Sequence, residues 1–116
     1  ADRAEHGWSP WYLVGRGPGE SLVGVCGFKG RPDASGSVEI SYSICASHRN
    51  VGYASEAVER LSRWAFNHAG VQTVTAETLP HLRQSIRVLE KNGFRQAGQG
   101  SEYGVVRFEL GRTNLR

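Results

Sequence analysis

The stretch Val38–Ala54, VEISYSICASHRNVGYA, decides the fold because the hydrophobic period changes within it. Apolar and polar side chains alternate up to Cys45, and a period of two predicts a strand with one buried face. From Ala54 to Ala69, apolar residues recur at the i, i+3, i+4 and i+7 spacing of an amphipathic helix. The apolar face of the strand consists of Val38, Ile40, Tyr42 and Ile44. The stretch therefore predicts a strand, a loop and a long helix in succession.

The flanking segments extend this unit into one α/β domain covering residues 1–116. A second, shorter helix is expected at Arg83–Lys91, and Gly- and Pro-containing turns separate the other elements. The expected strands are Trp11–Val14, Leu22–Lys29, Val38–Cys45, Val71–Thr78, Phe94–Ala97 and Val105–Leu110. Because the long helix forms a crossover between strands 38–45 and 71–78, these two strands are predicted to be parallel and near neighbours in a mixed sheet.

Composition narrows the class of protein. The 116 residues include 14 Lys and Arg against 11 Asp and Glu, and 39% of them are hydrophobic, as is usual for one globular domain. No apolar run approaches the roughly 18–20 residues that span a membrane. The basic residues are scattered along the chain, so we expect no nucleic-acid partner, and the dispersed histidines suggest no metal site. Two cysteines in strand-like stretches indicate reduced thiols and a cytoplasmic protein.

The loop before the long helix is the strongest candidate for a binding site. A helix N-terminus leaves about four backbone N–H groups unpaired, and these groups attract phosphate. Gly52 allows an anion to approach the backbone, and Arg49 can add a charge-assisted hydrogen bond. An ordinary tight turn has the same local sequence features, so the loop taken alone leaves both interpretations open. The Walker and dinucleotide-binding glycine patterns are absent.

A second motif supports the anion-binding interpretation. Arg49, Gly52 and Ala54 form an R-x-x-G-x-A motif, and SIRVLEKNGF follows at Ser85–Phe94. In this order and spacing, the chain resembles the GNAT superfamily of acetyl-CoA-dependent N-acetyltransferases over about residues 22–110. It is most similar to the branch that includes the ribosomal-protein alanine N-acetyltransferases. The resemblance implies a GNAT-like α/β fold, an acyl-CoA N-acyltransferase fold with a mixed, mostly antiparallel sheet and flanking helices.

The N-terminus departs from this branch. Its members usually begin with a strand and two helices, whereas only Ala1–Gly7 precede the aromatic run that contains the first expected strand. We therefore expect either a truncated form or a naturally N-terminally short member that completes its sheet with a partner chain. An uncovered sheet edge and apolar face favour a homodimer.

The resemblance also implies a binding site for acetyl-CoA and no metal. In the family, the strand before the phosphate loop separates from the next strand, and the thioester lies between them. A backbone N–H of Ile44 or Cys45 would then polarise the thioester carbonyl. The family's loop holds the CoA pyrophosphate, and the matching residues here are Arg49, Asn50, Val51, Gly52, Tyr53 and Ala54.

Two catalytic residues are expected, each with a simpler interpretation beside it. Glu39 lies on the polar face of its strand and can accept the amine proton, although an exposed glutamate paired with an arginine would look the same. The tyrosine that many members use as proton donor is replaced by Leu89. In the resembling branch a serine near the helix start is thought to face the sulfur, and Ser85 occupies that place. A serine there is also a common helix cap.

The function predicted from these features is direct transfer of an acetyl group from acetyl-CoA to a primary amine, either a protein N-terminus or a small amine. The second hypothesis is a non-catalytic CoA-binding or assembly module derived from the same fold.

Overall fold

The computed structural model describes residues 11–14, 22–44 and 53–114. Its helices are α1 (Tyr53–Phe66), α2 (Arg83–Lys91) and the short 3-10 helix η3 (Arg112–Asn114). Its strands are β1 (Trp11–Val14), β2 (Leu22–Phe28), β3 (Ser37–Ile44), β4 (Thr73–Thr78), β5 (Arg95–Gln99) and β6 (Val106–Gly111). The predicted order of strands and helices is confirmed, and the bounds of β1 and α2 are those expected.

The strands form one six-stranded sheet with the order β1-β2-β3-β4-β6-β5. β3 and β4 are parallel, and the other four neighbouring pairs are antiparallel. The crossover through α1 therefore makes β3 and β4 parallel neighbours, and the sheet is mixed and mostly antiparallel, as predicted.

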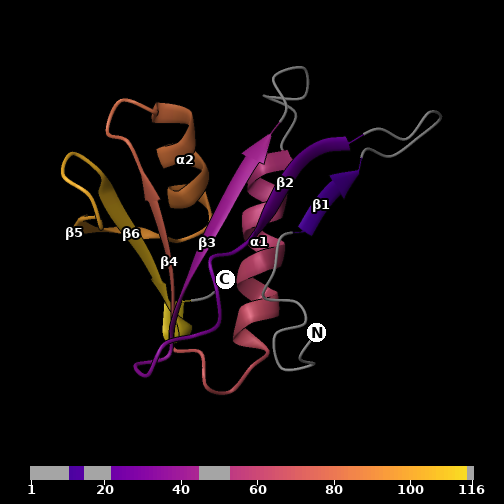
Figure 1. Ribbon diagram of the computed structural model, residues 1–116, viewed down its shortest axis with the longest axis vertical. Coiled ribbons are helices and arrows are strands. Elements are labelled where there is room, and N and C mark those ends of the chain that lie inside the picture. Colours follow the sequence, from indigo (N-terminus) through magenta and orange to yellow (C-terminus); the bar gives the residue numbers. More distant parts are fainter. Residues whose placement is uncertain (1–10, 15–21, 45–52, 115–116) are drawn as a thin grey trace.

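The parallel pair is held together at one end only. β3 and β4 pair from Ser37–Thr73 to Glu39–Thr75, and beyond that point the two strands diverge toward α2 (Figure 1). β3 remains paired with β2 as far as Ile44, while β4 remains paired with β6 as far as Thr78. We call the separated segments 40–44 of β3 and 76–78 of β4 the β3–β4 opening.

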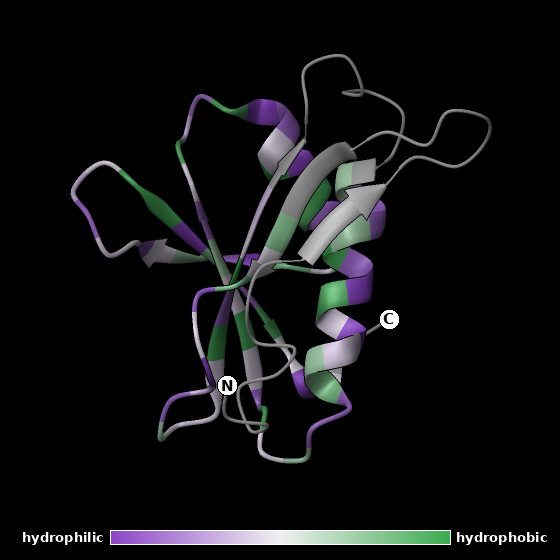
Figure 2. Ribbon diagram, turned by 45° about the vertical axis from the view of Figure 1, so that its right-hand side comes forward, coloured by the Kyte–Doolittle hydropathy of each residue, from purple (hydrophilic) through white to green (hydrophobic). Residues whose placement is uncertain are grey.

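Both helices pack on one face of the sheet. α1 contacts β2 and β3, and α2 contacts α1 and β4. The core between them includes Val38 and Ile40 of β3, Val74 and Ala76 of β4, and the helix residues Ala57, Val58, Leu61, Ala65 and Leu89. Hydrophobic and hydrophilic bands alternate along α1 (Figure 2), as its amphipathic pattern predicts. Cys26 is a free, buried thiol in this core.

α1 ends at Phe66, three residues before the expected Ala69. Here the backbone changes to a tighter turn, in which the N–H of His68 donates to Ala65 O at 3.0 Å. The next strand also begins later than expected, at Thr73, because the N–H of Gln72 donates to Gly36 O at 2.8 Å. The end of α1 is therefore set by a local turn, and the start of β4 by a hydrogen bond to a turn that is distant in the sequence.

Candidate functional site

The strand before the predicted loop and the helix after it are both present. β3 ends at Ile44, α1 begins at Tyr53, and Ala54 lies half-buried in the first turn of α1. The expected loop residues Cys45, Arg49, Asn50, Val51 and Gly52 lie outside the described residues.

Asn92 connects the first turn of α1 to the end of α2. Its Nδ2 donates to Ser55 Oγ at 3.2 Å, to Ser55 O at 3.3 Å and to Val88 O at 2.9 Å. Because Asn92 is the C-cap residue of α2, this one amide ties both helices together beside the N-terminus of α1. Sequence reasoning assigned no role to Asn92, although it precedes the glycine of the KNGF segment.

The backbone of β3 turns alternate N–H groups toward the opening. The N–H of Lys29 donates to Glu39 O at 2.9 Å, so the peptide groups of Glu39 face β2. The register with β2 is regular from Ile40 to Ile44. Because successive residues of a strand face opposite neighbours, the backbone N–H groups of Tyr42 and Ile44 are directed toward the side of β4. Both lie beyond the last β3–β4 pair.

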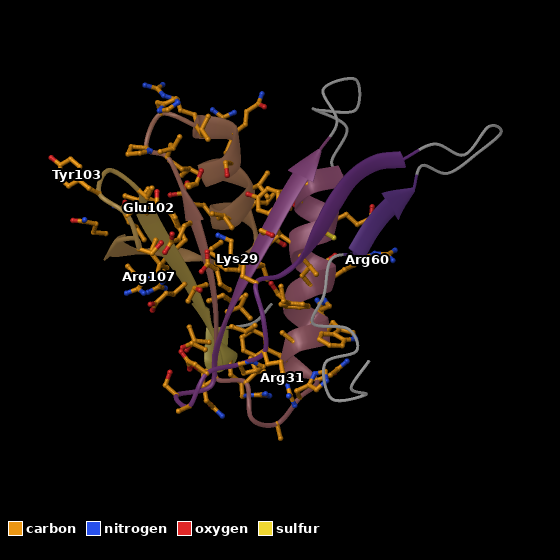
Figure 3. The ribbon with its side chains drawn as sticks, viewed as in Figure 1. Lys29, Arg31, Arg60, Glu102, Tyr103 and Arg107 are labelled. Atoms are coloured by element: carbon orange, nitrogen blue, oxygen red, sulfur yellow. The ribbon has the colours of Figure 1, made fainter. Side chains whose placement is uncertain are left out.

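Glu39 lies where the opening begins, on the face of the sheet opposite the helices. Its carboxylate Oε2 is 3.1 Å from Lys29 Nζ, and the Glu39 side chain is 27% exposed. The contact is an ion pair without hydrogen-bond geometry, since Oε2 has no hydrogen-bond partner among the described residues. Within the described part of the chain, the ion-pair partner of Glu39 is thus Lys29, which lies beside β3 in Figure 3.

Ser85 does not cap α2, so that interpretation is wrong. The N-cap residue is Leu82, which makes no side-chain cap hydrogen bond, and Ser85 lies within the first helical turn. Its Oγ is instead 3.0 Å from the phenol oxygen of Tyr42 on β3. Sequence reasoning placed Tyr42 only on the apolar face of a strand. One indication of this contact is present in the sequence: Tyr42 carries a hydroxyl on a strand face whose other residues, Val38, Ile40 and Ile44, are wholly apolar.

Tyr42 is half-buried against the core, with its hydroxyl directed at α2. Burial raises the pKa of the Tyr42 phenol above its usual value, and the hydrogen bond with Ser85 offsets part of that increase. The phenol therefore stays protonated at neutral pH.

The two expected catalytic residues flank the opening from opposite sides of the sheet. Glu39 points to the face away from the helices, whereas Tyr42, three residues along β3, points to the helix face and meets Ser85 there. Because side chains alternate across a strand, Glu39 and Ser85 do not touch. A group that lies between the strands could reach both residues.

Glu77, near the end of β4, holds the turn between β5 and β6. Its carboxylate accepts hydrogen bonds from Ser101 N and Ser101 Oγ, both at 2.8 Å. Gly100 packs on the same carboxylate, because a Cβ at Gly100 would lie 2.9 Å from Glu77 Cδ. Tyr103 projects from this turn and is 96% exposed (Figure 3). Sequence reasoning assigned no role to Glu77.

Two properties of the described residues bear on other kinds of site. No group of three or more His, Cys, Asp or Glu side chains among them is arranged to hold a metal ion. No helix in the described part of the chain combines the length and apolar character needed to cross a membrane.

Known proteins are similar to this chain in both sequence and fold. Residues 1–95 match the family described as Acetyltransferase (GNAT) domain. A relative named as an uncharacterized N-acetyltransferase, YjdG of Bacillus subtilis (strain 168), is 36% identical over 97 residues, which are 84% of this chain and 57% of the relative. The chain thus spans less than two thirds of that relative.

Solved structures extend the likeness to three dimensions. A GNAT-family acetyltransferase from Bacillus anthracis is 26% identical with a TM-score of 0.69, covering 79% of this chain and 60% of that one. A ribosomal-protein-S5-alanine acetyltransferase from Vibrio fischeri is 17% identical with a TM-score of 0.71, covering 82% of this chain and 57% of that one. At that identity the second likeness concerns the fold alone.

Proposed function

The chain belongs to the GNAT acetyltransferase family, and from this premise we propose that it transfers an acetyl group from acetyl-CoA directly to a primary amine. The observation that carries the proposal is the β3–β4 opening immediately before the β3–α1 junction. An extended thioester inserted between the two strands would find backbone groups of β3 that pair with no described strand on that side, and a helix N-terminus at its end.

The proposed binding residues follow from this placement. Arg49, Asn50, Val51, Gly52, Tyr53 and Ala54 would hold the pyrophosphate at the N-terminus of α1. The N–H of Ile44 or Cys45 would polarise the thioester carbonyl. Ile44 is favoured, because its N–H is directed toward the opening.

The proposed chemistry uses one residue from each face of the sheet. Glu39, directly or through water, would take the proton of the attacking amine as its nitrogen bonds to the carbonyl carbon. The carbon–sulfur bond breaks, and Ser85 would give a proton to the departing sulfur. Glu39 lies at the base of the opening, and Ser85 lies on the helix that closes its other side.

The acceptor is proposed as a protein N-terminus or a small amine. Similarity of fold to the ribosomal-protein-S5-alanine acetyltransferase supports testing the first. We also propose that the protein is a homodimer and that it acts in the cytoplasm. The Glu39–Lys29 ion pair favours the second candidate function, a non-catalytic CoA-binding module, because the carboxylate is already paired with a cation.

Calorimetric titration with CoA and acetyl-CoA tests the proposed binding site. The wild-type chain should bind both ligands, and Gly52→Asp should bind neither, because the new carboxylate would repel the pyrophosphate. Gly70→Asp is the matched control: it adds the same charge at a glycine with open space around it, and should bind as the wild type does. A folded wild-type chain that binds neither ligand would contradict the proposal.

Turnover distinguishes the two candidate functions. Release of CoA should be measured with alanine-initiated peptides and with small aliphatic amines. Acetylation of either acceptor class supports the enzyme, whereas tight CoA binding without turnover on any amine supports the binding module.

A further inference from the structure

The hydrogen bond between Tyr42 and Ser85 links the two elements that border the opening on its helix side. Tyr42 Oη lies 3.0 Å from Ser85 Oγ and 3.4 Å from Ser85 O, across 43 residues of sequence. Tyr42 belongs to the part of β3 that has left β4, and Ser85 belongs to the first turn of α2. The contact therefore joins two elements at the place where the strands have separated.

Either hydroxyl can be the donor in this hydrogen bond, and the chemistry of the two groups favours the phenol. A phenol is a much stronger acid than an aliphatic alcohol, so it is the better donor. Both nearby oxygens of Ser85 can accept the phenol proton, and Oγ is the closer. With the Tyr42 hydroxyl as the donor to Oγ, the hydrogen of Ser85 would be free to point at a different acceptor.

We propose that Tyr42 is a positioning residue, whose phenol donates to Ser85 Oγ and directs the Ser85 proton toward the leaving sulfur of CoA. This inference rests on the proposed acetyl transfer and adds a residue to it. Burial of the phenol supports the assignment, because it keeps the donor proton in place at the pH of the reaction.

The proton balance of the step is simple. As the carbon–sulfur bond breaks, sulfur leaves with the electron pair and takes the proton of Ser85. The Tyr42 proton moves to the Ser85 oxygen, so that no alkoxide forms, and the phenolate regains a proton from water when the product leaves. No oxidant, reductant or further reactant is needed.

A purely structural role for Tyr42 is separable from this one. The ring packs against the core, and phenylalanine keeps that packing while it removes only the hydroxyl. Tyr42→Phe therefore tests the hydrogen bond without opening a cavity. Tyr103→Phe is the matched control, because it removes a hydroxyl from a side chain that is 96% exposed.

The experiment is a double-mutant cycle on steady-state kinetics with Tyr42→Phe, Ser85→Ala and both changes together. We expect Tyr42→Phe to lower kcat by about 10- to 100-fold, at or below the lower end of the range usual for a direct general acid or base, because Tyr42 acts through Ser85. The KM for acetyl-CoA and the Kd for CoA should stay within about twofold of wild type. The double variant should be no slower than Ser85→Ala, because both changes interrupt one unit.

The outcomes separate this inference from the proposed function. Wild-type turnover together with a Tyr42→Phe variant at full kcat overturns the role of Tyr42 and leaves acetyl transfer intact. Additive losses in the cycle, or a loss that falls on KM alone, also overturn it. A wild-type chain that acetylates no amine overturns both proposals at once.

Discussion

Gly36 provides the sharpest test of how the sheet is held at its closed end. Gly36 has φ +83, and its carbonyl accepts hydrogen bonds from Gln72 N at 2.8 Å and Thr73 N at 3.2 Å. These bonds fix the start of β4 beside the start of β3, from which the paired end extends to Glu39. A Cβ at Gly36 would lie 2.6 Å from Gly70 O, closer than real Cβ atoms approach, and 3.2 Å from Gln72 N, which is also a tight contact.

The expected cost of Gly36→Ala has two parts. An alanine in this left-handed region costs roughly 1–2 kcal/mol. Relief of the clash must move backbone, which weakens two hydrogen bonds worth about 0.5–1.5 kcal/mol each. The free energy of unfolding should therefore fall by about 2–5 kcal/mol. Gly104→Ala is the matched control, because Gly104 has nearly the same φ, +86, with nothing within 4 Å of the added carbon.

Urea unfolding followed by circular dichroism measures both variants. With an m-value of about 1–3 kcal/mol per molar, Gly36→Ala should lower the midpoint by on the order of 1–3 M. Gly104→Ala should lose only about 1–2 kcal/mol, from its backbone conformation. Equal destabilisation of the two variants would refute the argument, since their only large difference is the backbone packed around Gly36.

Three further changes test other parts of the site. Asn92→Leu removes the donor to Ser55 and should lower the free energy of unfolding in urea by about 1–2 kcal/mol. CoA should also bind several-fold more weakly in calorimetry. An unchanged Kd would mean that the hydrogen bonds of Asn92 do not support the binding loop. Glu39→Gln should lower kcat by about 100-fold or more as a lost base, whereas Lys29→Ala should affect it much less; equal effects would make the ion pair the important feature. Hydrogen bonds from Ser35 and Ser37 lower the pKa of Asp33 below its usual value, so the stability it contributes is complete above pH 3.8 and is lost as the pH falls through the folded-state pKa. The thermal midpoints of wild type and Asp33→Ala should therefore differ at pH 7 and converge in strong acid. A difference that stays constant with pH would be inconsistent with this linkage.

Local patterns in the sequence were sufficient to predict most of the fold. The alternation in β3 and the helical spacing from Ala54 each depend on which side of one element is buried. Burial confirmed the helical side of α1, and it confirmed the alternation from Val38 to Tyr42. The end of α1 was harder to predict from the sequence, because the helical spacing continues to Ala69 while hydrogen bonds of His68 and Val71 end the helix earlier. Periodicity therefore predicted the faces of elements better than their ends.

The positions of candidate site residues within one strand or helix could be predicted from the sequence. Contacts between residues of two different elements could not. Glu39 was placed on the correct face by alternation alone, but its partner Lys29 follows from the lateral register of β2 and β3. Ser85 was correctly located near the start of a helix. Its contact with Tyr42 could not be predicted, because it depends on how α2 approaches β3 across 43 residues of chain.

The opening itself follows from competition between strand partners, which no single segment of sequence encodes. Beyond Glu39, β3 continues to pair with β2, and beyond Thr75, β4 continues to pair with β6. Each strand thus keeps its antiparallel hydrogen bonds on one side when the parallel pairing ends. The separation therefore costs each strand hydrogen bonds on its other side only. α2 packs over the same side and meets β3 through Tyr42 and Ser85. The same divergence that directs the N–H of Ile44 away from β2 also separates β3 from β4 between Glu39 on one face of the sheet and Ser85 on the other, which is the arrangement that the proposed acetyl transfer requires.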